Sequence, residues 1–320
     1  MLFSANHPLQ IQIAEDVAIM RIYDPQLNKN IFNSKIFRMP DEPFILIDVN
    51  PIIVNHLNHT IYTIGNKIST TSYIKNYELV REFYVYVDEI LYTTFWATYN
   101  WSDIPTFDDR YISTNNISSE FYPNQLLFFN VNSKNLSTNV NIYFNSTVLG
   151  SYTSDTSQMI TVNTAQLSLT KGDTINFDSD LGNVKMNYNP CPIPYMIYYI
   201  NEFGAMSYLP IQHCKLIDSF ERSEITRHFD KGTTDFGRTN IDVQIAQKYE
   251  CTTQILNEYD IPYIKSLMAS TKIYLHNLNT HTITPVIITN KDLDWKKVVK
   301  RKDVIQYTLN LESSQFEKRR

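Results

Sequence analysis

The chain has 320 residues, of which 43% are hydrophobic and 13% aromatic, so it is long enough and apolar enough to form two or three folded domains. Its net charge of −5 at pH 7 argues against a protein whose main task is to bind nucleic acid, because contacts to phosphate need concentrated Lys and Arg. The N-terminus has no signal-peptide pattern, and the longest apolar runs are too short to span a bilayer.

The first predicted module, residues 1–105, is made of β-strands. Apolar and polar residues alternate along residues 9–23, which is the pattern of half-buried strands. Residues 51–57 predict a single helical turn that begins after Asn50 as its N-cap. Two further strands are predicted, at residues 44–49 and 81–90.

The second predicted module, residues 106–189, resembles a β-sandwich in its pattern. Short apolar strands follow one another with Asn, Ser and Asp turns between them, which favours a sandwich or barrel over alternating strands and helices. Because the whole chain has only seven glycines, we expect Asn and Asp to occupy the turn positions that need a positive φ. The predicted strands are residues 126–131, 141–144, 159–162, 165–169, 174–177 and 184–188.

The third predicted module, residues 190–320, follows a proline-rich linker at residues 189–194, where prolines exclude both a helix and a central strand. It begins with a hairpin over residues 194–211, and its later strands follow at residues 214–227, 239–256, 271–278, 283–290 and 304–312.

One short amphipathic helix, residues 260–270, interrupts these C-terminal strands. Asp260 is its predicted N-cap, and Pro262 is tolerated in its first turn. Its apolar stripe has helical spacing and consists of Ile261, Ile264, Leu267 and Met268. The fold class is therefore mainly β, with two or three antiparallel sandwich or barrel modules and one short helix in the C-terminal module.

The three cysteines, Cys191, Cys214 and Cys251, are odd in number and widely spaced, so they indicate no disulfide framework. We expect buried free thiols in a reducing compartment. His213 beside Cys214 suggests half a zinc site, but the spacing matches no ligand pattern of that metal.

Two further pairs of polar residues are possible functional sites, and both are better explained as ordinary surface residues. His276 and His281 flank a predicted hairpin turn and are expected to be two surface imidazoles. Asp108 and Asp109 suggest an acid pair, but adjacent residues of a strand face opposite sides, which favours a solvated loop. No nucleophile motif, P-loop or GxGxxG sequence is present. We therefore expect no enzyme: no catalytic residue, no metal, no cofactor and no small-molecule substrate.

A basic run, KKVVKRK at residues 296–302, lies just before a predicted strand. Three acidic residues flank it and dilute its field, which favours a solvated connector, with an acidic partner and DNA as the alternatives. Its charged residues are Lys296, Lys297, Lys300, Arg301 and Lys302.

The order of the C-terminal segments resembles a family, the structural tail proteins of crass-like and related bacteriophages of gut Bacteroidetes. The segments are YMIYYINEFGAMSYLPI, DSFERSEITR, ILNEYDIPYIKSLMASTKIYL, PVIITN and IQYTLNLE, and FILIDVNPIIVNHL with YVDEI is loosely similar to the N-terminal half. The resemblance implies a β-barrel hub module whose single helix lies across one open end, and it transfers no catalytic residue. It implies a structural virion protein that assembles in the host cytoplasm into a homo-oligomeric ring or hub.

In such a hub, the expected partners are other copies of the chain and other tail or portal proteins, with DNA only in passage. A rival interpretation is a receptor- or carbohydrate-binding tip or fibre, in which aromatic residues stack on sugar rings. A tail-borne glycosidase is the third interpretation. It requires two carboxylates in one cleft, and the sequence pattern does not indicate such a pair. The candidate aromatic residues of the rival are Tyr99, Trp101, Phe107 and Tyr111.

Overall fold

The structure, a computed structural model, describes a mainly β protein. The described residues are 2–4, 9–60, 74–78, 80–98, 111–113, 119–132, 137–154, 158–201, 205–226, 238–254, 256, 260–290, 296–297, 305–314 and 317–319.

These residues form two compact units. The first contains the described residues up to Pro190 together with Ile200–Ser207, and the second contains Cys191–Tyr199 and Tyr208–Arg320. The division expected between residues 105 and 106 stays a prediction, because residues 99–110 lie outside the described ranges.

The N-terminal strands form a five-stranded sheet in the order β1-β8-β7-β3-β4. The alternation predicted within residues 9–23 is confirmed, because Ala18, Met20 and Ile22 of β3 are buried while the residues between them are more exposed. A separate antiparallel pair consists of β2 and β5, which flank β3 and β4 in the sequence. The strands are β1 (Leu2–Ser4), β2 (Gln10–Ile13), β3 (Val17–Asp24), β4 (Lys29–Phe37), β5 (Ile45–Asp48), β7 (Val80–Val87) and β8 (Ile90–Thr98).

Helix α1 (Asn50–Thr60) is longer than the single turn predicted from the sequence. The Oδ1 atom of Asp48 accepts a hydrogen bond from the N–H of Asn50 at 3.0 Å, which satisfies a backbone donor where the helix begins. Ile53 and Leu57, one turn apart, are 2% and 0% exposed. The single-turn prediction was wrong because this buried pair extends the helix beyond its first turn.

A β-sandwich follows, made of a five-stranded sheet (β10-β16-β15-β12-β13) and a four-stranded sheet (β6-β14-β11-β9). Phe129 of β11 stacks on Phe177 of β15, with ring centroids 4.6 Å apart, so the two sheets meet through apolar side chains. The strands are β6 (Ile74–Glu78), β9 (Tyr111–Ser113), β10 (Glu120–Phe121), β11 (Leu126–Asn132), β12 (Thr138–Phe144), β13 (Thr147–Ser154), β14 (Gln158–Asn163), β15 (Thr174–Ser179) and β16 (Gly182–Tyr188).

The strand predicted at residues 165–169 is wrong. The chain leaves β14 in a 3₁₀ turn, η1 (Thr164–Gln166), in which the N–H of Ala165 donates to the Oδ1 atom of Asn163. The buried hydroxyl of Thr164 donates to the carbonyl of Tyr122 at 2.8 Å and accepts from the N–H of Gln125. This buried polar network ends the strand at Asn163, although the apolar alternation continues beyond it.

Turns use Asn and Asp at positive φ, as expected from the small number of glycines. Six described residues other than glycine have a positive φ, and four of them are Asn or Asp. These residues are Asn28, Asp88, Glu89, Asn124, Asn145 and His281.

The C-terminal strands close into a six-stranded barrel in the order β18-β17-β20-β21-β24-β19, with β18 pairing back to β19. The predicted hairpin at residues 194–211 is confirmed, since β17 and β18 are neighbours and the N–H of Asn201 donates to the carbonyl of Ala205 at 2.8 Å. The strands are β17 (Tyr195–Ile200), β18 (Met206–Thr226), β19 (Arg238–Thr253), β20 (Ile273–Asn277), β21 (Thr282–Ile288) and β24 (Thr308–Ser313). Three short strands complete this part: β22 (Lys296–Lys297), β23 (Ile305–Gln306) and β25 (Glu317–Arg319).

The helix predicted at residues 260–270 is confirmed as α2 (Ile261–Ala269). It follows the C-terminal end of β19 and precedes β20, and the hydroxyl of Tyr199 near the end of β17 donates to the carbonyl of Tyr263 at 3.2 Å. Ile264 and Leu267 are fully buried. Helix α2 therefore packs its apolar stripe at this end of the barrel, and Asp260 stands at the N-cap without a side-chain capping bond.

Candidate functional site

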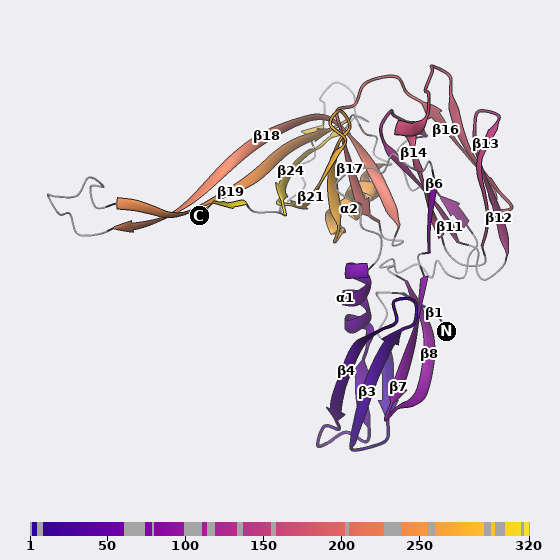
Figure 1. Cartoon of the computed structure of the whole chain (residues 1–320), viewed down its shortest axis with the longest axis vertical. Coiled ribbons are helices and arrows are strands. Elements are labelled where there is room, and N and C mark those ends of the chain that lie inside the picture. Colours follow the sequence, from indigo (N-terminus) through magenta and orange to yellow (C-terminus); the bar gives the residue numbers. More distant parts are fainter. Residues whose placement is uncertain are drawn as a thin grey trace. The chain divides into compact units, whose positions relative to one another are not determined.

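The candidate functional surface is a two-stranded ribbon that continues β18 and β19 beyond the barrel. We call it the arm and define it as Lys215–Thr226 of β18 paired with Arg238–Glu250 of β19. Strand β17 has six residues and β18 has 21, so β17 pairs with only the first part of β18. Figure 1 shows the paired strands extending away from the other strands of the barrel.

Large apolar side chains of the arm are exposed on both faces. Leu216 and Phe220, four residues apart on one face, are 53% and 56% exposed, and Ile217 on the opposite face is 40% exposed. The β19 side of the arm has further strand neighbours, because β24 pairs with Lys248–Thr252 at the base and β25 pairs with Val243–Ile245 farther along the arm. A ribbon of two strands has marginal stability alone, so this surface has a physical reason to bind another sheet or chain.

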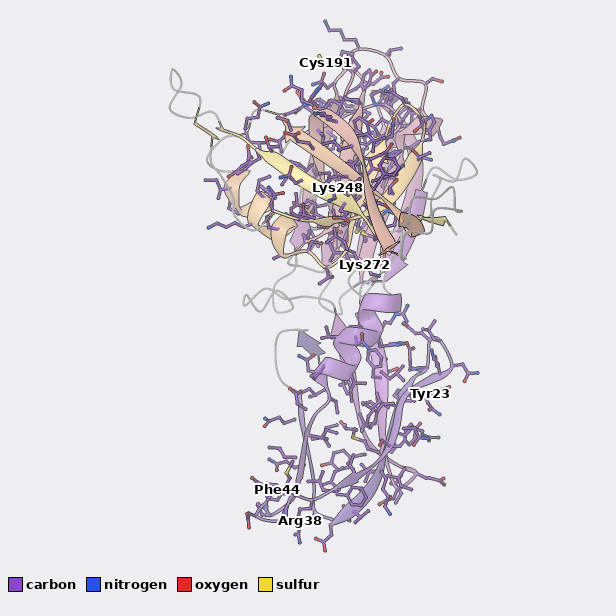
Figure 2. All side chains as sticks on the ribbon, turned by 90° about the vertical axis from the view of Figure 1, so that its left-hand side faces the viewer. Tyr23, Arg38, Phe44, Cys191, Lys248 and Lys272 are labelled. Carbon is purple, nitrogen blue, oxygen red and sulfur yellow. The ribbon has the colours of Figure 1, made fainter. Side chains whose placement is uncertain are left out.

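The outer edge of the arm is also available for pairing. Among the described strands, β18 has only β17 and β19 as neighbours, and β17 does not extend along the arm. An edge strand presents unpaired backbone donors and acceptors, which favour addition of a further strand. Charges of both signs lie along the ribbon, with exposed Lys215 directly opposite exposed Glu250 (Lys248, nearby on β19, is labelled in Figure 2). The arm therefore offers backbone pairing, apolar contact and mixed charge on one element.

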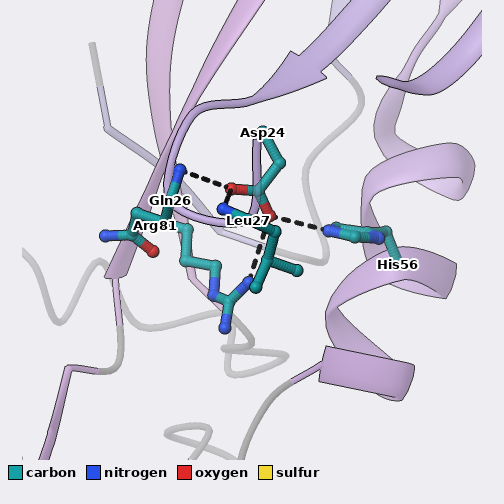
Figure 3. Close-up of polar contacts among 5 residues, drawn as sticks. All are labelled: Asp24, Gln26, Leu27, His56 and Arg81. Atoms are coloured by element: carbon teal, nitrogen blue, oxygen red, sulfur yellow. Dashed lines mark hydrogen bonds and ion pairs between the residues drawn. The ribbon is translucent and has the colours of Figure 1, made fainter. Parts of the chain in front are cut away.

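A second cluster lies in the N-terminal sheet, where the fully buried carboxylate of Asp24 faces two basic side chains (Figure 3). Its Oδ2 atom is 2.8 Å from Nε2 of His56 on α1 and accepts from Nη1 of Arg81 on β7 at 3.0 Å. Its Oδ1 atom accepts from the backbone N–H groups of Gln26 and Leu27. One carboxylate thus connects β3, α1, β7 and the turn that follows β3.

The electrostatics of this cluster favour an ionised Asp24. Burial by itself raises the pKa of the carboxyl, but the hydrogen bonds from His56 and Leu27 and the charge of Arg81 lower it below its usual value. Alternation along β3 places Asp24 on the same face as buried Met20 and Ile22. Because Asp24 continues the period-two series of buried residues in β3, the sequence contained a signal that this carboxylate is buried. The predictions from the sequence did not include it.

A groove lies beside this cluster, between the start of β4 and α1, and His56 forms part of its wall. Its lining combines a lysine, an imidazole, amides and apolar side chains. The lining residues are Lys29, Asn30, Ile31, Pro51, Ile52, Asn55 and His56.

The cysteines differ from the expectation of three buried thiols. Cys251 is buried and Cys214 is half-buried. Cys191 is exposed and is labelled in Figure 2. Cys214 and Cys251 are directly opposite each other in the β18–β19 ladder, with their Sγ atoms 2.9 Å apart. The sequence did not reveal this contact because the two residues are 37 positions apart and meet only when the strands pair.

The expectation of two surface imidazoles at the β20–β21 hairpin is wrong for His276. Its side chain is fully buried, and its Nδ1 atom is 3.1 Å from the hydroxyl of Tyr198. Burial, with a smaller effect of the charge of His281, lowers the pKa of His276 to about 4, so the ring is neutral at pH 7. His281 is exposed in the turn, as expected. The prediction failed because both faces of β20 are buried around His276, which the local sequence pattern does not reveal.

The structure describes only some of the remaining candidates. Within the described ranges, no group of three or more His, Cys, Asp and Glu side chains gathers to hold a metal ion. His213 is exposed and lies opposite Thr252 in the ladder. Lys296 and Lys297 of the basic run form β22. The following candidates lie outside the described residues: Asp108, Asp109, Tyr99, Trp101, Phe107, Lys300, Arg301 and Lys302, while Tyr111 begins β9.

Comparisons with known proteins identify no family. No family model matches the chain, and no curated protein matches its sequence. A chain from the tail of an empty GTA particle is a weak structural match, with a TM-score of 0.25, 10% identity and coverage of 40% of this chain and 96% of that chain. The native conformation of E. coli alpha-2-macroglobulin matches with a TM-score of 0.21, 8% identity and coverage of 99% of this chain and 33% of that chain. Neither score defines a common fold.

Neither described helix is both long and apolar enough to cross a membrane. The class defined by the fold is thus a mainly β protein that carries a closed six-stranded barrel with a long two-stranded arm.

Proposed function

We propose that this protein is a structural subunit of a bacteriophage tail, which oligomerises into a ring or hub and docks neighbouring tail proteins around the DNA passage. The arm is the observation that carries the proposal. It exposes Leu216 and Phe220 on a two-stranded ribbon whose outer edge has no further described strand. A ribbon of this kind gains stability when a second protein covers it.

The mechanism of the proposal is mechanical. The arm of one subunit packs on, or adds a strand to, the neighbouring copy, and closure of the ring then covers every arm. The arm carries charges of both signs, so two copies can approach without like-charge repulsion over a large area. The net charge of −5 suits a passage for DNA, because strongly cationic walls would hold the phosphates.

The finer assignments of the proposal come from the sequence. The segment order that resembles crass-like phage tail proteins supports placement in a tail of that group, with assembly in the host cytoplasm and location in the virion. The proposal assigns the chain no catalytic role and no cofactor. The rival assignment, a receptor- or carbohydrate-binding tip, gains no specific observation from the described residues.

The protein is expected to be a stoichiometric component of purified phage particles. A ring subunit is present in several copies per particle because each copy completes the closed interface. Quantitative mass spectrometry of purified particles, calibrated against a capsid protein of known copy number, measures this ratio. Absence from particles, or less than about one copy per particle, contradicts the structural role.

The arm variant Leu216→Asp/Phe220→Asp is expected to lose self-association while keeping its fold. Both side chains are more than half exposed in the single chain, so its melting temperature should change little. Each buried side chain contributes about 1.5–3 kcal/mol at an interface, so association should weaken about 100-fold or more. Mass photometry and sedimentation velocity measure the oligomer, and differential scanning fluorimetry measures the fold.

Val148→Asp is the matched control for the arm variant, because Val148 is 55% exposed but lies on β13 of the sandwich. It should assemble as the wild type does. A wild-type protein that stays monomeric at high concentration, or an arm variant that forms the same oligomer, would remove the support that the arm gives to the proposal.

A further inference from the structure

A pair of thiols lies at the base of the arm, where β18 leaves the barrel. Cys214 and Cys251 are opposite each other in the ladder, and their Sγ atoms are within about 1 Å of the disulfide bond length. Cys251 is fully buried and also pairs with Leu309 of β24, so its strand is held on both sides. Directly opposite residues of antiparallel strands have Cα atoms about 4.5–5.5 Å apart, which is within the range that a disulfide spans.

We propose that Cys214 and Cys251 are a covalent modification site, at which an oxidised low-molecular-weight disulfide such as oxidised glutathione converts the two thiols into an intramolecular disulfide. The register already places both side chains on one face of the ladder, so the bond forms without a change of strand pairing. This inference does not depend on the proposed tail function.

The two cysteines have different roles in the exchange. Cys214 is half-buried, and the hydrogen bond from the Cys251 thiol lowers the pKa of Cys214. The same hydrogen bond, followed by burial, raises the pKa of Cys251. Cys214 is therefore the thiolate that an external disulfide reaches, and Cys251 is the resolving thiol.

The reaction has two steps. The Cys214 thiolate attacks one sulfur of oxidised glutathione, forms a mixed disulfide and releases glutathione thiolate, which takes up a proton. Cys251 then loses its proton to solvent and attacks Sγ of Cys214, which releases a second glutathione. Overall, two protein thiols lose two electrons and two protons, and one oxidised glutathione becomes two reduced glutathione molecules.

The bond would hold the base of the arm. It closes a loop between residues 37 positions apart that contains the whole arm, so it removes chain entropy from the unfolded arm and opposes separation of β18 from β19. Reduced and oxidised protein should therefore differ in stability.

The test incubates the reduced full-length protein with oxidised glutathione at neutral pH and maps its peptides by mass spectrometry without reduction. The expected result is a peptide pair joined through Cys214 and Cys251, with a loss of two hydrogen atoms from the intact mass. The melting temperature of the second unit should rise by several degrees, and dithiothreitol should reverse both changes.

Three variants identify the sites. Cys191→Ser should form the same bond, since Cys191 is the exposed cysteine outside the pair. Cys251→Ser should retain one glutathionyl group on Cys214, and Cys214→Ser should form no intramolecular bond. Wild-type protein that keeps all three thiols in excess oxidised glutathione, or whose bridges all involve Cys191, would overturn the proposal. Both of these results are measured on the wild-type protein, so they do not depend on whether a variant folds. They are also independent of the abundance of the protein in particles, which tests the proposed tail function.

Discussion

Replacement of Leu267 by Asp is expected to unfold the barrel or to destabilise it by about 4 kcal/mol or more. Leu267 is fully buried on the apolar stripe of α2, and removing a buried leucine costs about 2–5 kcal/mol through lost transfer energy and the cavity that remains. The aspartate adds an unpaired charge in an apolar site, which increases the cost. Because the free energy of unfolding of a domain is only about 5–15 kcal/mol, this loss is a large part of the total stability.

Lys265→Asp is the control for this variant. Lys265 is exposed on the same helix, so its replacement introduces the same residue type without burying a charge. Its effect should stay within about 1 kcal/mol. Circular dichroism during thermal and urea unfolding measures both variants. A Leu267→Asp protein that melts within one or two degrees of the wild type would mean that α2 is not packed on the barrel.

Asp24→Asn is expected to destabilise the N-terminal sheet by about 3 kcal/mol, since it removes the charged partner of a buried ion pair. The carboxylate is fully buried and contacts His56 and Arg81 at 2.8 and 3.0 Å. Asparagine keeps the shape of the side chain, so the loss reports the charge rather than a cavity. Hydrogen–deuterium exchange of peptides from β3 and α1 should rise, and urea unfolding should give the free energy.

Asp16→Asn is the control for the second variant. Its ion pair with Arg38 is exposed, with side chains 73% and 37% accessible, so its loss should change stability by less than about 1 kcal/mol. Equal effects of the two substitutions would show that the buried cluster does not stabilise the sheet.

The Asp24 contribution also has a defined pH dependence. The pKa of Asp24 is lowered in the folded protein, so its stabilising effect is present above the pKa of the unfolded chain, about 3.9, and is lost as the pH falls through the lower folded value. The difference in unfolding free energy between wild type and Asp24→Asn should therefore be constant near neutral pH. It should shrink below about pH 4, and a difference that persists at pH 2 would contradict the assignment.

Local patterns in the sequence determined most of the secondary structure. Alternation predicted β3, β7 and the barrel hairpins, because the side chains of a strand alternate between two faces and this alternation is independent of the partner strand. The stripe of α2 was predicted for the same reason, since Ile264 and Leu267 lie on one face of any helix. The scarcity of glycine indicated turns at Asn and Asp because these residues tolerate positive φ.

Tertiary structure alone decided which of these faces are buried and which residues meet. Cys214 contacts Cys251, Asp24 pairs with Arg81, and the buried His276 contacts Tyr198. Each contact joins residues that are distant in sequence, and a local pattern carries no information on such partners. The exposure of the arm has the same origin. Leu216 and Phe220 fit the apolar pattern of a buried strand, but the short β17 does not extend to them, and no other described strand pairs with this edge of β18, so they remain exposed.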